Sequence, residues 1–94
     1  MVVIIFIIIL IGSDYMQIAD AVKERIIDLC HDNNISINKL AVMSGQTQST
    51  LQSLIDGKSK KPKLLTLVRV CDSLNITLKE FFDNDLFNNI DTEL

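Results

Sequence analysis

The stretch that decides the fold runs from Ile37 to Ile55 and reads INKLAVMSGQTQSTLQSLI. It holds two short segments with helical spacing of apolar residues, joined by a turn that contains glycine. Ala41 is small enough for two helices to cross closely, and Gly45, four residues later, suits a tight turn with positive φ. Three leucines would hold both helices against one core: Leu40, Leu51 and Leu54. This spacing is typical of a helix-turn-helix.

The composition favours one helical domain. The chain has 94 residues, which is enough for one domain and too few for two. Hydrophobic residues make up 48% and charged residues 22%, so the chain can fold around a core. Three Gly and one Pro are too few for the many turns of a sandwich or barrel. Two separate Cys and one His offer no metal set or catalytic pair, so we expect no enzyme and no cofactor.

Apolar spacing before the central stretch predicts a first helix. Its inward residues recur at spacings of four, four and three: Ile18, Val22, Ile26 and Leu29. Asn33-Asn34 ends this helix, and Ser36 is the N-cap of a second helix that reaches Ser44. Thr47 caps a third helix, which Asp56-Gly57 ends.

A basic loop follows, and two more helices are expected after it. The inner stripe of the fourth helix is formed by Leu64, Leu67, Cys71 and Leu74. Thr77 and Glu80 form a T-x-x-E capping box, so a short fifth helix starts at Leu78 and buries Phe81 and Phe82. Both cysteines lie on apolar stripes and are expected to be buried thiols, as suits a reducing cytosol.

Taken together, residues 18–82 resemble the Cro/repressor (XRE) family of DNA-binding domains, whose fold is lambda-repressor-like. The residues that carry the resemblance are Leu40-Ala41, Gly45, Thr47-Gln48-Ser49, Leu51, Leu54, Asp56-Gly57-Lys58, Pro62, Leu67, Leu74 and Phe81-Phe82. The resemblance implies a compact all-α domain of five helices. Its second and third helices would form the helix-turn-helix, and the third would read the DNA major groove.

The resemblance also implies which residues contact DNA. Base readout would fall to the exposed face of the third helix: Gln48, Ser49, Gln52 and Ser53. A Gln amide suits this role because it can bond adenine N6 and N7 together. The DNA backbone would be contacted by the residues Asn38, Gln46, Thr47, Lys58, Lys60, Lys61 and Lys63. The alternative is that these polar side chains are only a solvated helix face and a solvated loop.

The charge distribution supports DNA binding although the total does not. The net charge is −3, which is unusual for a nucleic-acid binder. Residues 17–70, however, carry eight basic and five acidic side chains, while the rest of the chain has one Lys against seven acids. A basic face and an acidic far side follow from this division.

The first eleven residues, MVVIIFIIILI, have no polar side chain and set residues 1–15 apart from a DNA-binding domain over 16–82. As a helix they would span about 16 Å, too little for a bilayer of roughly 30 Å, so a membrane span is not expected. Three readings stay open. In the first, the translation start is placed too early and Met16 is the true start. In the second, the segment packs on the domain or on a partner. In the third, it lies on a membrane surface.

These observations predict that the protein is a small cytoplasmic transcriptional regulator. It would bind double-stranded operator DNA and would have no small-molecule substrate. One helix-turn-helix reads few base pairs, so we expect a homodimer on a palindrome and a repressor role. The acidic tail, residues 83–94, is a candidate dimer or partner contact through Phe82, Leu86, Phe87 and Ile90, unless these cap the chain's own core. The alternative function is an antitoxin-type module that binds a toxin protein and its own promoter.

Overall fold

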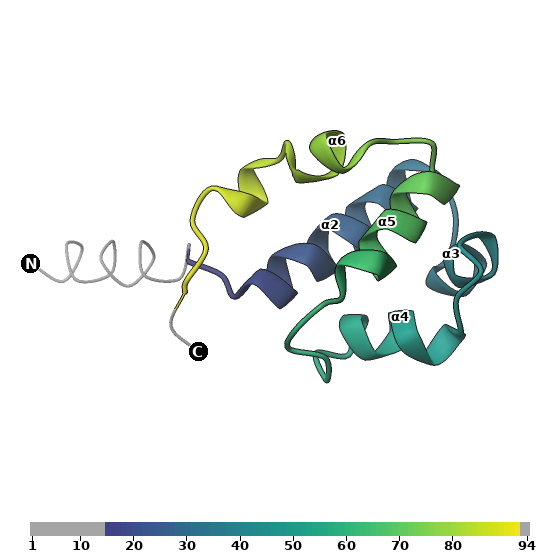
Figure 1. The fold of residues 1–94 in the computed structure, drawn as a ribbon, viewed down its shortest axis with the longest axis horizontal. Coiled ribbons are helices and arrows are strands. Elements are labelled where there is room, and N and C mark those ends of the chain that lie inside the picture. Colours follow the sequence, from purple (N-terminus) through teal and green to yellow (C-terminus); the bar gives the residue numbers. More distant parts are fainter. Residues whose placement is uncertain (1–14, 93–94) are drawn as a thin grey trace, which may run out of the picture.

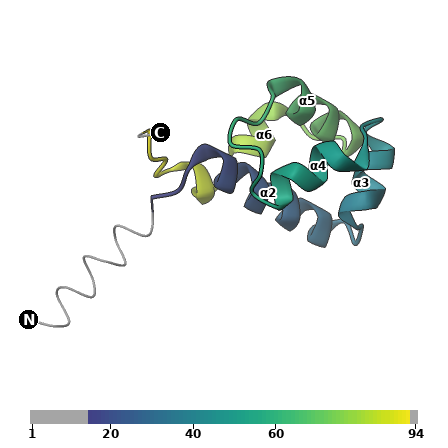
Figure 2. The same ribbon diagram turned by 90° about the horizontal axis from the view of Figure 1, so that it is seen from below.

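The computed structural model describes residues 15–92, and these residues form an all-α domain (Figure 1). In chain order the helices are α2 (Ile18–Asp32), α3 (Ile37–Met43), α4 (Gln48–Ile55), α5 (Leu64–Ser73) and α6 (Leu78–Phe82), followed by the 3-10 helix η1 (Asp85–Phe87). The five expected α-helices are therefore confirmed. Figure 1 shows α4 and α6 on opposite sides of the domain, and in Figure 2, which is seen from below, α4 lies in front of α6.

The first four helices all end in the same way. Each is followed by a residue with positive φ: Asn34 (54°), Gly45 (68°), Gly57 (75°) and Asn75 (58°). At each end two backbone N–H groups turn back onto carbonyls of the last turn, as in a Schellman motif. A Cβ at Gly45 would meet nothing within 4 Å, so the left-handed backbone alone explains why glycine suits this position.

Three of these ends lead directly into an N-cap. Ser36 accepts a hydrogen bond from the Lys39 N–H, and Thr47 accepts one from the Thr50 N–H. Thr77 and Glu80 form the complete capping box that the sequence predicts, with both hydrogen bonds at 3.0 Å. The predicted starts of these three helices are confirmed because they depend on local hydrogen bonds that short-range sequence signals encode.

The core lies where α2, α3, α4 and α5 meet. Its buried residues include Val22, Ile26, Leu40, Ala41, Leu51, Leu54, Leu67, Val70 and Phe81. Cys30 and Cys71 are buried there as expected, and burial raises the pKa of both thiols. The leucines of the helix-turn-helix thus pack as their spacing predicts.

Two core assignments from the sequence were wrong. Leu64 is 63% exposed, since it is the first residue of α5 and shares its outward face with Leu65 and Val68. Thr66 and Val70 take buried places on the inner face instead. Phe82 stays 36% exposed beside the fully buried Phe81, because consecutive helical side chains point about 100° apart.

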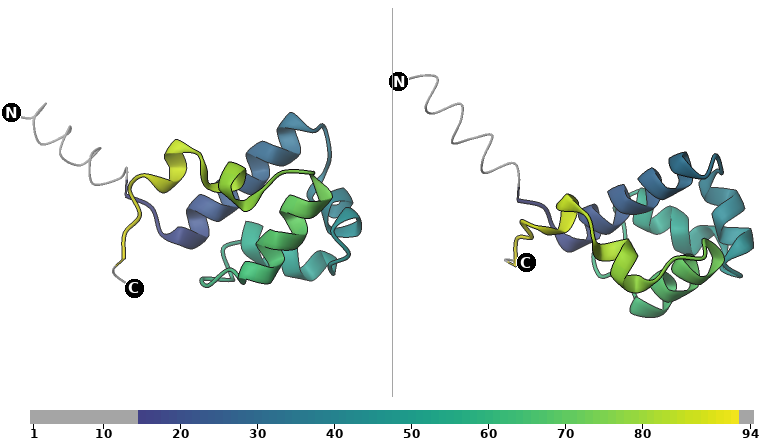
Figure 3. Two further views of the ribbon diagram at one scale, coloured as in Figure 1. Left: turned by 45° about the horizontal axis from the view of Figure 1, so that its top comes forward. Right: turned by 90° about the horizontal axis from the view of Figure 1, so that it is seen from above.

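The segment after α6 returns to the start of α2 (Figure 3). Phe87 packs its ring against Phe82, with centroids 4.8 Å apart, and also lies close to Phe81. A parallel bridge then joins Met16 to Ile90. These contacts show that part of the tail covers the chain's own core, which was the alternative to a dimer surface.

Arg25 joins α2 to the end of α6 in a way that the sequence did not indicate. Its Nε donates to the Phe81 carbonyl at 2.7 Å, and its Nη2 donates to the Glu80 carbonyl at 2.9 Å. The guanidinium also lies 5.8 Å from the centre of the Phe81 ring. A cation suits these carbonyls because they close the C-terminal end of α6.

The three readings of the apolar segment fall on residues 1–14, which lie outside the described residues. Within residues 15–92, every helix is too short or too polar to cross a membrane.

Candidate nucleic-acid interface

Helix α4 presents a polar face on the side away from the core. Leu51 and Leu54 are buried, so the other side of the helix carries the four predicted base-reading residues. Gln48 and Ser49 are exposed, and Gln52 and Ser53 are half-buried. Among the described residues, the amide of Gln48 makes no hydrogen bond, so both its donor and its acceptor groups are available to a ligand.

The turn between α3 and α4 is held by a chain of hydrogen bonds. The Ser44 hydroxyl is buried and donates to the Leu40 carbonyl at 2.8 Å. Gln46 Nε2 donates to that hydroxyl at 2.9 Å, and the Gln46 N–H donates to the Ala41 carbonyl. Gln46 thus braces the turn with both nitrogens, and its contact with a phosphate stays a prediction.

Hydroxyl groups gather at the N-terminus of α4. Thr47 Oγ1 lies 2.8 Å from Thr50 Oγ1 and 3.2 Å from Ser49 Oγ. The same oxygen accepts the Thr50 N–H, so it is used in capping. This arrangement fixes the rotamers of Thr47 and Ser49 at the end of the helix where amides and dipole favour an anion.

A basic groove of about 330 Å³ lies between α4 and the loop that follows it. Its lining combines lysines of the loop with hydroxyls of α4: Lys58, Lys61 and Lys63 with Thr50 and Ser53. The loop is held against α4 because the Lys58 and Ser59 N–H groups donate to the Ser53 carbonyl. Three of the four predicted loop lysines are therefore brought together beside the polar face of α4.

Two further predicted contacts, Lys60 and Asn38, do not line this groove. Lys60 lines a second, more apolar cavity with Gln17, Ala19 and Asp20 near the start of α2. Asn38 is exposed on the first turn of α3. Leu54, Ser59 and Lys61 line both cavities, so Lys60 lies beside the basic groove without lining it, whereas Asn38 is on another helix.

Arg69 is a basic residue of this region that the sequence analysis did not select. It comes from α5 and lines a cavity with Thr47, Thr50 and Lys63 at the start of α4. Arg69 follows Thr66 by three residues, so the two side chains lie on the same side of α5. This spacing is the sequence signal that could have placed Arg69 beside α4.

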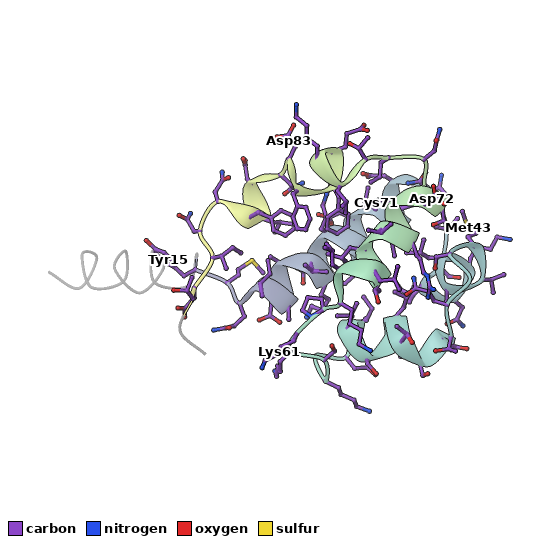
Figure 4. All side chains as sticks on the ribbon, in the orientation of Figure 1. Tyr15, Met43, Lys61, Cys71, Asp72 and Asp83 are labelled. Atoms are coloured by element: carbon purple, nitrogen blue, oxygen red, sulfur yellow. The ribbon has the colours of Figure 1, made fainter. Side chains whose placement is uncertain are left out.

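Charges are divided between two sides of the domain. Figure 4 shows Lys61 in the loop after α4, and Asp83 on the opposite side beside α6. The exposed acids Asp83 and Asp85 both follow α6. Since Arg25 is used inside the fold, the cations beside α4 come mainly from the loop lysines and Arg69. The loop lysines and these two acids thus lie on opposite sides, as the sequence predicted, while the exposed acid Asp56 stays on the basic side at the end of α4.

A five-helix domain with these two crossing helices, a left-handed glycine turn and a polar second helix is a helix-turn-helix DNA-binding domain. The family comparison agrees: residues 25–84 match the Cro/C1-type HTH DNA-binding domain. The chain therefore belongs to the Cro/C1-type family, whose members bind DNA in transcription regulation.

A solved structure is also similar to this chain. It is the crystal structure of the prophage Lp1 protein 11, which is 32% identical and superposes with a TM-score of 0.71. The match covers 79% of this chain and 97% of that chain. Comparison with curated protein sequences gives no significant match.

Proposed function

We propose that the protein is a cytoplasmic transcriptional repressor that binds a specific double-stranded DNA operator. Helix α4 lies in the major groove, where Gln48, Ser49, Gln52 and Ser53 face base edges. The observation that carries the proposal is the polar face of α4 with the three-lysine groove directly beside it. Side chains for reading bases and charges for holding phosphates then occupy one surface.

The backbone contacts give affinity and register rather than sequence choice. Lys58, Lys61 and Lys63 lie along the phosphates on one side of α4, and Arg69 approaches them at the start of this helix. Asn38 contacts the strand that passes the start of α3. Each neutralised phosphate releases a counterion, so binding weakens steeply as salt rises.

The protein acts as a homodimer on a palindrome, because one α4 covers only a few base pairs. The outward face of α5 suits a second copy of this chain: Leu64, Leu65 and Val68 are 63%, 56% and 40% exposed. This face is preferred to the tail because Phe87 and Ile90 already have partners within the chain. Leu64→Ser should lower the sedimentation mass at low micromolar concentration, and an unchanged mass would exclude α5 as the dimer surface.

The DNA-binding proposal is tested by fluorescence anisotropy on the DNA upstream of the protein's own gene, beside a scrambled duplex. We expect Gln48→Ala to weaken specific binding about tenfold, because a well-placed glutamine supplies about 1–3 kcal/mol of discrimination. Asn89→Ala removes an exposed amide far from α4 and is the matched control. Equal affinity for both duplexes, with no effect of Gln48→Ala, would reject sequence-specific reading of this DNA by α4.

A second function is favoured by the acidic side of the domain. Asp83 and Asp85 are exposed opposite the basic loop, so a basic protein can bind there while α4 holds DNA. An antitoxin works in this way, binding its toxin and its own promoter. Co-purification of a small basic protein from native cells, lost in Asp83→Lys, would support this function.

A further inference from the structure

A hydrogen bond joins two side chains on the exposed face of α4. Gln52 Nε2 donates to Asp56 Oδ1 at 2.8 Å, across one turn of helix. An ionised carboxylate has only acceptors, so it can hold the amide nitrogen of Gln52 and not its carbonyl oxygen. Asp56 therefore fixes the orientation of this amide, and leaves Oε1 as an acceptor and the second Nε2 hydrogen as a donor for a ligand.

Asp56 stands where an acid is unfavourable for folding. It is the C-cap of α4, and the helix dipole disfavours a negative charge at this end. The basic loop starts two residues later, so the carboxylate would also be repelled by phosphates held there. Within residues 15–92 the one ion pair joins Lys23 and Glu24, so no ion pair there offsets the Asp56 charge. Its bond to Gln52 is the contact that accounts for an acid here.

We propose that Asp56 is a positioning residue that makes Gln52 read DNA as a hydrogen-bond acceptor. The inference rests on the proposed function, in which α4 lies in the major groove. A glutamine amide without a partner can flip, which exchanges the positions of its oxygen and nitrogen. It can therefore accept from one base or donate to another. Held by Asp56, Gln52 presents Oε1 and accepts from the exocyclic amine of adenine or cytosine. Guanine and thymine present the acceptors O6 and O4 there, so Oε1 would lose its partner at these bases. They are therefore disfavoured, although the second Nε2 hydrogen can still donate.

The test begins with duplexes that the full-length wild-type chain selects from a random pool of double-stranded DNA. The sequence preference of Gln52→Ala is then compared with that of the wild type. The position at which the preference is lost is the base that Gln52 reads. At that base we expect the wild type to prefer adenine or cytosine over guanine or thymine by about tenfold. Asp56→Asn should reduce this ratio to about threefold or less, because an asparagine amide both donates and accepts and so lets Gln52 turn over. Asp56→Glu restores a carboxylate and should keep most of the preference.

The control separates hydrogen bonding from charge. Asp72→Asn removes one exposed carboxylate from α5, so it should raise affinity for all duplexes alike without changing the ratio. In the ¹⁵N-labelled protein without DNA, Asp56→Asn should move the Gln52 side-chain amide signals, whereas Asp72→Asn should not.

The inference is overturned if Asp56→Asn keeps the wild-type ratio, or if the base read through Gln52 is guanine or thymine. Either result would leave specific DNA binding intact, so it differs from failure of the proposed function. If the wild type enriches no sequence at all, the proposed function fails and this inference fails with it.

Discussion

The junction between α2 and α3 and the junction between α5 and α6 are built from one local pattern. In chain order the first contains Cys30, Asn34, Ile35 and Ser36, and the second contains Cys71, Asn75, Ile76 and Thr77. In both, the isoleucine N–H donates to the cysteine carbonyl at 3.0 Å, and the asparagine takes a positive φ. Both then start the next helix with a hydroxyl N-cap.

The two junctions differ at the third residue of the helix that follows. Glu80 closes the capping box by accepting the Thr77 N–H, whereas Lys39 stands at the same place in α3 and has no acceptor to offer. A lysine in the first turn is also disfavoured by the helix dipole. The junction far from the proposed DNA surface thus has the residue that best stabilises a helix. The junction that begins the helix-turn-helix has a cation that suits phosphate.

Glu80→Lys should break the more stable junction and give the largest effect. It removes one capping hydrogen bond and places a cation at the start of α6, so we expect a loss of about 2 kcal/mol in the free energy of unfolding. Urea denaturation measures this loss. Asp83→Lys makes the same change of charge just beyond α6 and should cost little. An equal loss in both variants would mean that net charge, and not capping, is responsible.

Lys39→Glu should make the first junction resemble the second. It creates an S-x-x-E box, so the free energy of unfolding should rise by about 0.5 kcal/mol. DNA affinity should fall about tenfold at low salt, with a shallower salt dependence, because a cation that we expect to face a phosphate is replaced by an anion. Lys79→Glu, on α6, is the charge-matched control for the anisotropy titration. If Lys39→Glu binds DNA no more weakly than this control, the start of α3 does not face phosphates.

The sequence predicted what depends on neighbours in the chain. Caps such as Ser36, Thr47 and Thr77 involve groups three residues apart, and the glycine turn depends on one backbone angle. What it missed depends on contacts between distant segments. Arg25 reaches carbonyls more than fifty residues away, and Met16 pairs with Ile90. Leu64 was assigned to the core because spacing alone does not show where a helix leaves the core.

The candidate site divides in the same way. The exposed face of α4 could be predicted from helical spacing, since Leu51 and Leu54 fix the opposite face. The grouping of loop lysines beside it depends on how the chain turns after Gly57. The hydrogen bonds that hold Gln46 and Gln52 depend on rotamers, which a list of polar residues does not contain.

Asn34→Ala and Asn75→Ala test whether the two junctions are equivalent in energy. Alanine is strained at positive φ by about 1 kcal/mol, so each variant should lose about that much in the free energy of unfolding. Glycine at either position should be nearly neutral, because it accepts this backbone conformation without strain. A large loss at one asparagine only, by thermal or urea denaturation, would show that its side chain has a further role there.

The smallest effect concerns the two buried cysteines that open the junctions. Burial raises the pKa of both thiols, since it disfavours the thiolate. The folded chain therefore keeps these protons to a higher pH than the unfolded chain does. Their contribution to stability is complete below the unfolded pKa and is lost as pH rises from there through the folded pKa. Between about pH 7.5 and about pH 9, in reductant, the free energy of unfolding should fall by about 1 kcal/mol or less.

Each thiol should contribute to this fall. At Cys30 burial acts alone, whereas at Cys71 the Arg25 guanidinium and a backbone hydrogen bond oppose the rise in pKa and the Glu80 carboxylate adds to it. Cys30→Ala and Cys71→Ala should therefore each remove part of the pH dependence. The measured quantity is the difference in unfolding free energy between the two pH values. The loss of stability from the cavity in each variant is the same at both pH values, so it cancels. An unchanged fall in either variant would mean that the pKa of the thiol it removes is the same in the folded and the unfolded chain.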